Sequence, residues 1–262
     1  MDGMYAAGEI RLNISDIQHY STGDGDGIRT TVFFKGCNLR CPWCHNPETL
    51  SSLPQRLREG NRERLCGRWM AVEEVLEEIL WDVDFYRESG GGATLSGGEV
   101  LLQAAGAAEL CRRLRERGIS VVIDTAGDVP YSAFAPLNRL GVEYFYDWKA
   151  CPAEYERVIG GNPVRIYENL ARLIADGQRV RVRVPLIPGL NDAPEYIAAI
   201  SEPLLKARVT SVELLPFHRL GSAKYAALGL EYPYKNVLPP TRAEIAAAVA
   251  AYAEHFAVTV GG

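Results

Sequence analysis

The chain contains no long apolar run and no block of basic residues. Its longest uncharged apolar stretch, residues 245–253, has nine residues, whereas a helix needs roughly 20 to cross a bilayer. The 28 Lys and Arg are outnumbered by 33 Asp and Glu, and the net charge is −5. A nucleic-acid backbone is bound by clustered Lys and Arg. We therefore expect a globular protein with no membrane-spanning helix and no nucleic-acid partner.

The chain also lacks a secretory signal, internal repeats and low-complexity linkers. Residues 1–5 show no basic segment followed by an apolar one, so we expect a cytoplasmic protein. Because cytoplasmic thiols stay reduced, the six cysteines are not expected to form a disulfide framework. We therefore expect the six thiols to serve in core packing, catalysis or metal binding.

Short β-branched or aromatic runs alternate with longer helical patterns along the chain, which is typical of parallel α/β architecture. We expect strands at residues 30–35, 93–96, 120–124, 143–147, 180–186, 211–215 and 257–260. We expect helices at residues 71–87, 99–117, 132–140, 163–176, 193–206 and 242–256. The polar, Arg-rich stretch 51–67 is expected to be a loop. Six or more βα units in series would curl into a full or partial barrel, with its ligand site at the C-terminal ends of the strands.

Three of the six cysteines follow the first of these strands, at Cys37, Cys41 and Cys44. Their spacing is C-x-x-x-C-x-x-C, with no fourth cysteine nearby. Three thiolates can hold three corners of a 4Fe-4S cluster and leave one iron open, whereas electron-carrying clusters usually take four protein ligands. The alternative is a zinc site with His45 as the fourth ligand. Structural zinc motifs, however, usually come as two separated pairs of ligands.

The cysteine triplet and its flanks resemble a known family. The matching segments are residues 23–30 (GDGDGIRT), 33–37 (FFKGC) and 44–47 (CHNP). The triplet spacing is the signature of the radical S-adenosylmethionine superfamily, and the longer run is similar to the activating enzymes of glycyl radical enzymes, in particular the pyruvate formate-lyase activating enzyme group. Asp26 stands where that family often has Pro. The resemblance implies a partial (β/α)6-type barrel with one 4Fe-4S cluster on Cys37, Cys41 and Cys44.

The resemblance also implies which residues bind S-adenosylmethionine. Its amino group would be received by the Gly-Gly-Glu element, Ser96, Gly97, Gly98 and Glu99. Asp147 would lie near the ribose, and Lys149 would pair with the methionyl carboxylate. Trp43 and His218 would lie near the adenosine. Asp124 and Asp147 would also hold a monovalent cation.

These cofactor assignments have structural alternatives. The glycine pair after residues 93–96 could be a tight turn between strand and helix, because glycine permits close approach of backbone segments. Asp124 could cap the turn that follows it, and Trp43 could pack under the cysteine loop.

The resemblance assigns the contacts with the substrate peptide to Asp24, Arg183 and His218. Arg183 alternates with Val182 and Val184 along a predicted buried strand. A buried guanidinium needs an anionic or carbonyl partner. A structural salt bridge would supply such a partner equally well, and a lone histidine after a strand is more often structural.

The activity implied by the resemblance is the installation of a glycyl radical. In the family, an electron from flavodoxin or ferredoxin reduces the cluster, and S-adenosylmethionine is cleaved to methionine and a 5′-deoxyadenosyl radical, which removes a Cα hydrogen from a glycine of a partner enzyme. We therefore expect an anaerobic oxidoreductase that acts as a monomer on a protein substrate. The alternatives are a radical S-adenosylmethionine enzyme acting on a small molecule or peptide, and a non-enzymatic iron-sulfur or zinc module.

The remaining cysteines limit the number of clusters. Many activating enzymes of this family insert a ferredoxin-like domain, with two further clusters on about eight cysteines, after the triplet. This chain has only Cys66 in the corresponding interval, and Cys111 and Cys151 lie farther along. Cys111, beside Leu110 and Leu114 on a predicted helix, is expected to pack in the core. We therefore expect residues 1–262 to form a single radical S-adenosylmethionine domain without the ferredoxin-like insertion.

Overall fold

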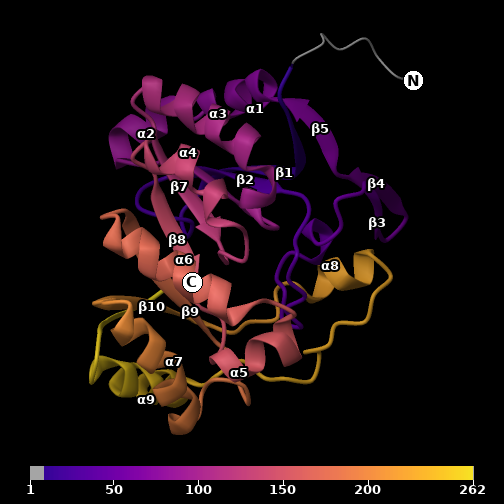
Figure 1. Ribbon diagram of the computed structural model, residues 1–262. Helices are drawn as coiled ribbons and strands as arrows, with labels where there is room; N and C mark the ends of the chain where they lie inside the picture. The colour runs from indigo at the N-terminus through magenta and orange to yellow at the C-terminus, as the bar shows by residue number, and fades with distance from the viewer. Residues whose placement is uncertain (1–8, 262) are drawn as a thin grey trace.

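A nine-stranded sheet forms the centre of the computed structural model, which describes residues 9–261 (Figure 1). The strands lie in the order β11-β10-β9-β8-β7-β6-β2-β1-β5. β2 and β6 to β11 run parallel, β1 pairs antiparallel with β2, and β5 pairs antiparallel with β1. The strands of this sheet are β1 (Arg11–Ser21), β2 (Arg29–Phe34), β5 (Arg68–Ala71), β6 (Gly92–Gly97), β7 (Ser120–Thr125), β8 (Glu143–Asp147), β9 (Arg179–Leu186), β10 (Ser211–Pro216) and β11 (Ala257–Val260).

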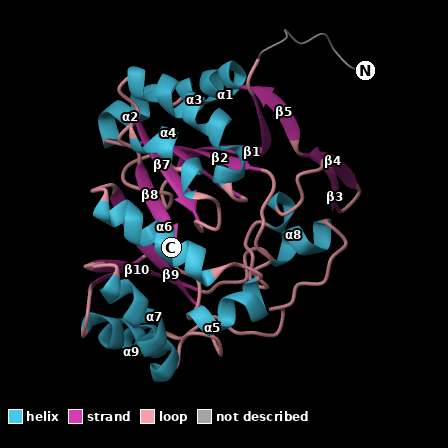
Figure 2. Ribbon diagram, viewed as in Figure 1, coloured by secondary structure: helices cyan, strands magenta, loops and turns pink. Residues whose placement is uncertain are grey.

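Helices lie around the sheet, as Figure 2 shows. The α-helices are α1 (Val72–Leu80), α2 (Val83–Ser89), α3 (Ala104–Glu116), α4 (Ala135–Asn138), α5 (Pro152–Glu154), α6 (Pro163–Ala175), α7 (Pro194–Lys206), α8 (Ser222–Ala227) and α9 (Arg242–Ala253). Short turns of other helix types are η1 (Pro47–Thr49), η2 (Val100–Gln103), η3 (Tyr131–Ala133) and η4 (Tyr155–Ile159). Within residues 9–261, no helix combines the length and the hydropathy needed to cross a membrane.

The predicted parallel α/β architecture is confirmed. Each of the seven expected strands is present, and its ends lie within one residue of the expected positions. β2 is buried along almost its whole length, as expected for a parallel strand covered on both faces. In the described part of the chain the end strands β5 and β11 do not pair with each other, so the sheet curls without closing. This is the predicted partial barrel.

The expected loop at residues 51–67 is wrong, because most of it forms a hairpin of β3 (Gln55–Glu59) and β4 (Arg62–Cys66). Gly60 and Asn61 make the two-residue connection between the paired residues Glu59 and Arg62, and Gly60 has a φ of 62°. Glycine adopts this left-handed backbone easily, and such short turns join antiparallel strands. The arginines hid the strand pattern because they lower the apparent hydropathy of alternate positions.

The expected helix at residues 71–87 is also wrong in part, because it is broken at Trp81 and Asp82 into α1 and α2. Asp82 is buried, and its side chain accepts hydrogen bonds from His19, at 2.8 Å, and Thr30, at 2.5 Å. These contacts with β1 and β2 hold Asp82 out of a continuous helix. β1 and β5 were not predicted, because both pair antiparallel and stand outside the alternation of parallel strands and helices. The expected lack of a secretory signal in residues 1–5 lies outside the described residues.

Candidate active site

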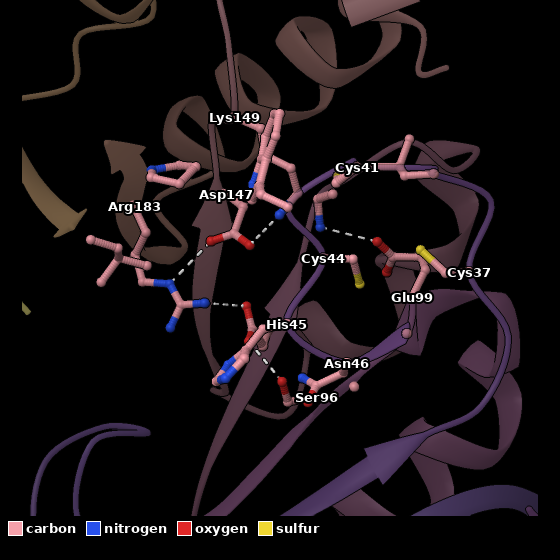
Figure 3. A pocket seen from close by; sticks show the side chains of 18 of the residues that line it. Cys37, Cys41, Cys44, His45, Asn46, Ser96, Glu99, Asp147, Lys149 and Arg183 are labelled. Carbon is pink, nitrogen blue, oxygen red and sulfur yellow. Dashed lines mark hydrogen bonds and ion pairs between the residues drawn. The ribbon is translucent and has the colours of Figure 1, made fainter. Parts of the chain in front are cut away.

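A pocket of about 590 Å³ opens at the C-terminal ends of the parallel strands. All fourteen residues that the sequence analysis assigned to cofactor, metal or substrate line it: Asp24, Cys37, Cys41, Trp43, Cys44, Ser96, Gly97, Gly98, Glu99, Asp124, Asp147, Lys149, Arg183 and His218. Figure 3 shows the three cysteines facing this pocket together with the charged side chains of neighbouring strands. The order of the strands therefore brings together residues that lie up to 194 positions apart in the sequence.

The three cysteines lie on one loop that directly follows β2. All three are free thiols and half-buried. Burial raises the pKa of Cys41 to about 12 and that of Cys44 to about 11, and it also raises the pKa of Cys37. Without a metal the thiols are therefore protonated at neutral pH, and a bound iron would supply the positive charge that stabilises the thiolates.

Backbone and side-chain hydrogen bonds hold the cysteine loop on two sides. On one side the Gly36 amide donates to the Thr49 carbonyl at 2.7 Å, and the Cys37 amide donates to the Leu50 carbonyl at 3.2 Å. On the other side Asn38 Nδ2 donates to the carbonyl of Asp128 at 2.7 Å. The loop is thus anchored to the segment that follows it and to the segment that follows β7.

A cluster of charged side chains forms the wall of the pocket at the ends of β7, β8 and β9. Arg183 donates from Nη2 to Asp124 Oδ1 at 2.7 Å and from Nε to Asp147 Oδ1 at 3.1 Å. Lys149 Nζ donates to Asp147 Oδ2 at 2.6 Å, and Ser96 Oγ donates to Asp124 Oδ2 at 2.7 Å. Every carboxylate oxygen of the pair has a donor. The salt bridge that was an alternative for Arg183 is present, and it lies inside the pocket.

The charges within this cluster follow from burial and from the neighbouring ions. Burial raises the pKa of Asp124 above its ordinary value, although Arg183 opposes the change. For Asp147, burial would also raise the pKa, but Lys149 and Arg183 outweigh it and lower the value. Burial alone would lower the pKa of Lys149 and of Arg183, but the neighbouring carboxylates outweigh it and raise both pKa values. At neutral pH the pocket therefore presents both signs of charge at one wall.

The Gly-Gly-Glu turn packs directly against the cysteine loop. The Glu99 amide donates to the Gly36 carbonyl at 2.9 Å, and a Cβ at Gly98 would lie only 2.2 Å from that carbonyl oxygen. The Glu99 carboxylate is 1% exposed and accepts hydrogen bonds from Thr125 Oγ1 and the Ala126 amide. Burial raises the pKa of Glu99. The element is thus a tight turn, as the structural alternative proposed, and it also lines the pocket.

The remaining predicted residues lie around the rim and floor of the pocket. Asp24 accepts a hydrogen bond from Thr31 Oγ1 at 2.7 Å. Trp43 packs edge-on against Tyr234, so it is part of an aromatic cluster as well as of the pocket wall. His218 is exposed, and its ring centroid lies 4.5 Å from that of His45.

Sequence reasoning missed a set of contacts that ties the cysteine loop to α8. Lys224 Nζ donates to Asn46 Oδ1 at 2.6 Å and to Glu48 Oε1 at 2.7 Å. His45 also lies here; burial, His218 and Lys224 lower its pKa to about 4, so its imidazole is neutral at pH 7. His45 and Asn46 belong to the family-like run, which could have marked them. Lys224 is 176 residues from Glu48, and nothing in the local sequence indicates the contact.

The cysteines outside the triplet are placed apart from the pocket. Cys111 is fully buried in the main hydrophobic cluster, which confirms its predicted packing role. Cys66 is buried in a small group with Leu57 and Ala227, and Cys151 is also buried. None of these three is among the residues lining the described pocket.

Known proteins are similar to this chain in both sequence and fold. The family model "Radical SAM superfamily" matches residues 31–199. The pyruvate formate-lyase 2-activating enzyme of Escherichia coli (strain K12) is 41% identical over 271 residues, covering 95% of this chain and 92% of that protein. The benzylsuccinate synthase activating enzyme of Thauera aromatica is 35% identical over 306 residues, with the same two coverages. A radical SAM methyltransferase from Sphaerobacter thermophilus shares the fold, with a TM-score of 0.65 at 17% identity over 94% of this chain and 76% of that one.

The contacts of Lys224 lead to a prediction about stability. Glu48 Oε2 is already buried without a hydrogen-bond partner, so replacing Lys224 by Met would remove the hydrogen bond and the ion pair of Glu48 Oε1 as well. We expect Lys224→Met to lower the free energy of unfolding by about 1–3 kcal/mol, measured by urea denaturation of the cluster-free protein. The matched control is Lys206→Met, which breaks the exposed pair with Glu202 and should change it by less than about 0.5 kcal/mol. Equal effects of the two substitutions would contradict the role given to Lys224.

Proposed function

Because this chain belongs to the radical S-adenosylmethionine (SAM) superfamily, and within it to the activating enzymes of glycyl radical enzymes, we propose that it installs a glycyl radical on a partner enzyme. The observation that carries the proposal is the convergence of the three thiols with Asp147, Lys149 and Arg183 on one pocket. The relatives are named as activating enzymes of different partners, so the particular glycyl radical enzyme must be identified by experiment.

The pocket suits a 4Fe-4S cluster with SAM. Three free thiols on one loop provide three ligands, and no fourth cysteine lines the described pocket, so one iron is left open for the cofactor. A volume of about 590 Å³ lies within the usual range for small-molecule sites. When bound and reduced, the cluster would supply the electron that cleaves SAM to methionine and a 5′-deoxyadenosyl radical. That radical would take the hydrogen from the glycine.

The residues around the cysteine loop would orient SAM by charge and by backbone groups. SAM carries a carboxylate, an amino group and a sulfonium, so it needs partners of both signs. We assign Lys149 to the carboxylate and Asp147 to the ribose. The turn Ser96, Gly97, Gly98 and Glu99 is assigned to the amino group. Trp43 and His218 are assigned to the adenosine.

The substrate glycine loop is assigned to Asp24, Arg183 and His218. Arg183 is held between two carboxylates inside the pocket, so its guanidinium is fixed in position before a substrate arrives. This preorganisation lowers the entropic cost of binding a peptide carbonyl. The pocket wall would also exclude water from the reacting carbon.

We further propose a single cytoplasmic domain that works as a monomer with one cluster and takes its electron from flavodoxin or ferredoxin. One hydrophobic cluster running from Leu12 to Phe256 supports the single domain. The alignment with the benzylsuccinate synthase activating enzyme has more positions than this chain has residues, so that relative contains segments that this chain lacks. The six free cysteines fit a reducing compartment.

The monovalent cation beside Asp124 and Asp147 can be tested by exchanging salts. All four carboxylate oxygens have donors, so we propose that the cation binds when Lys149 leaves Asp147 for the SAM carboxylate. Replacing KCl by tetramethylammonium chloride, whose cation is too large for such a site, should weaken SAM binding several-fold, as measured by equilibrium dialysis with the reconstituted protein. Equal affinity in the two salts would exclude the cation.

The cluster assignment is tested by matched cysteine substitutions. The anaerobically reconstituted protein should be brown, hold about four irons per chain and form 5′-deoxyadenosine from SAM after reduction with dithionite. Cys41→Ala should lose the bound iron and the activity, because it removes a ligand. Cys111→Ala should keep both and lose only packing energy. A colourless zinc protein, or equal effects of the two variants, would contradict the assignment.

The activating role is tested with the partner itself. The reduced protein, mixed with SAM and a glycyl radical enzyme encoded nearby, should produce the doublet glycyl radical signal in electron paramagnetic resonance. The control is a partner in which the radical-forming glycine is replaced by alanine, which should give no signal. SAM cleavage without a radical on any candidate partner would instead favour a small-molecule or peptide substrate.

A further inference from the structure

The hairpin, which we define as residues 55–66 including β3 and β4, concentrates positive charge in an acidic chain. It contains four arginines and two glutamates, a net charge of +2, whereas the whole chain has −5. In Figure 1 the hairpin lies at the edge of the molecule, above α8. This surface takes no part in the assignments above.

The two faces of the hairpin differ in character. The inner face packs on α8 through Leu57 and Cys66, both 1% exposed. On the outer face, Arg56 lies opposite Leu65, and the three side chains that dominate it are strongly exposed, at 76% for Arg56, 75% for Arg58 and 66% for Leu65. An exposed leucine framed by arginines has the composition of a small protein-binding surface.

A single carboxylate pairs with both outer arginines. Glu63 accepts from Arg56 Nη1 at 3.1 Å and from Arg58 Nε at 2.8 Å. Two guanidiniums share one carboxylate, so the group keeps a net positive charge.

The hairpin is linked directly to the start of the cysteine loop. Lys35 Nζ, on a side chain that is 2% exposed, donates to Gln55 Oε1 on β3 at 2.9 Å and to the Glu48 carbonyl at 2.6 Å. Lys35 directly precedes Gly36 and Cys37 in the chain. The first residue of the hairpin is thus connected, through one buried side chain, to the backbone that carries the first cluster ligand.

We propose that the outer face of the hairpin is the docking surface for a one-electron carrier protein with an acidic face around its cofactor. The inference rests on the proposed function, because a cluster that cleaves SAM must first receive one electron, which the reduced carrier loses. No described residue of the hairpin lines the pocket, so a carrier can dock while the pocket holds the partner's glycine loop. Opposite charges speed such encounters, and redox complexes need only small interfaces.

The test compares two reductants in matched charge-reversal variants. Arg56→Glu/Arg58→Glu changes the hairpin, and Arg87→Glu/Arg172→Glu makes the same change in net charge at exposed arginines elsewhere that are also paired with acidic residues. The reconstituted enzymes are assayed for 5′-deoxyadenosine with reduced flavodoxin at about 50 and about 300 mM NaCl, and separately with dithionite.

The hairpin variant should lose about ten-fold or more of the flavodoxin-dependent kcat/KM at low salt and most of its salt dependence. Its dithionite-dependent rate should stay within about two-fold of the unchanged enzyme, which also shows that the variant folds and binds its cluster. The control variant should keep both rates. A milder variant, Arg56→Gln/Arg58→Gln, should give an intermediate loss with flavodoxin.

Equal flavodoxin-dependent rates in the hairpin and control variants would overturn the proposal. The proposal would also fall if the hairpin variant kept its flavodoxin-dependent rate but lost glycyl radical formation, because the surface would then bind the partner enzyme. Absence of 5′-deoxyadenosine from the unchanged enzyme with dithionite would be a failure of the proposed function itself. The dithionite assay therefore separates the two failures.

Discussion

The parallel pairing of β2 with β6 is the constraint on which the site depends. Phe34 lies opposite Gly97 in this ladder, and the amide of Gly98 donates to the Phe34 carbonyl at 2.8 Å. The cysteine loop and the Gly-Gly-Glu turn leave these two strands at the same level and form one backbone unit. A shift of one residue in the register would turn each side chain of the strand to the opposite face. The pocket could not form in that register, even with every functional residue present.

The sequence predicted this part of the molecule well because its signals are local. A buried parallel strand is a short apolar run, and the residues just after it lie at the same edge of the sheet as those after its neighbours. Cys37, Glu99, Asp124 and Lys149 could therefore be assigned to one site without knowing any distance between them. The resemblance to a family added their chemical roles, and the geometry adds which of them are already paired with each other.

What could not be predicted arises from contacts between distant segments or from side chains that hide a pattern. The break between α1 and α2 follows from the hydrogen bonds of Asp82 with two strands, and a helical period cannot reveal them. Lys224 reaches the cysteine loop from a short helix with no motif of its own. The sequence predicts a loop at the hairpin because arginines occupy alternate strand positions, although the Gly60-Asn61 pair is typical of a tight turn between strands.

Between the end strands β5 and β11 the described barrel has no backbone hydrogen bonds that would close it. α8, which follows β10, contacts the hairpin and η1 through Lys224 and the small apolar group around Ala227, so it is held by side chains rather than by strand pairing. Parting such a contact costs on the order of a few kcal/mol, whereas a paired strand must break several backbone hydrogen bonds together. A closed barrel admits a polypeptide through its end openings alone. This one can admit the middle of a chain from the side, so that a loop of a folded protein can enter and leave without either of its own ends being threaded.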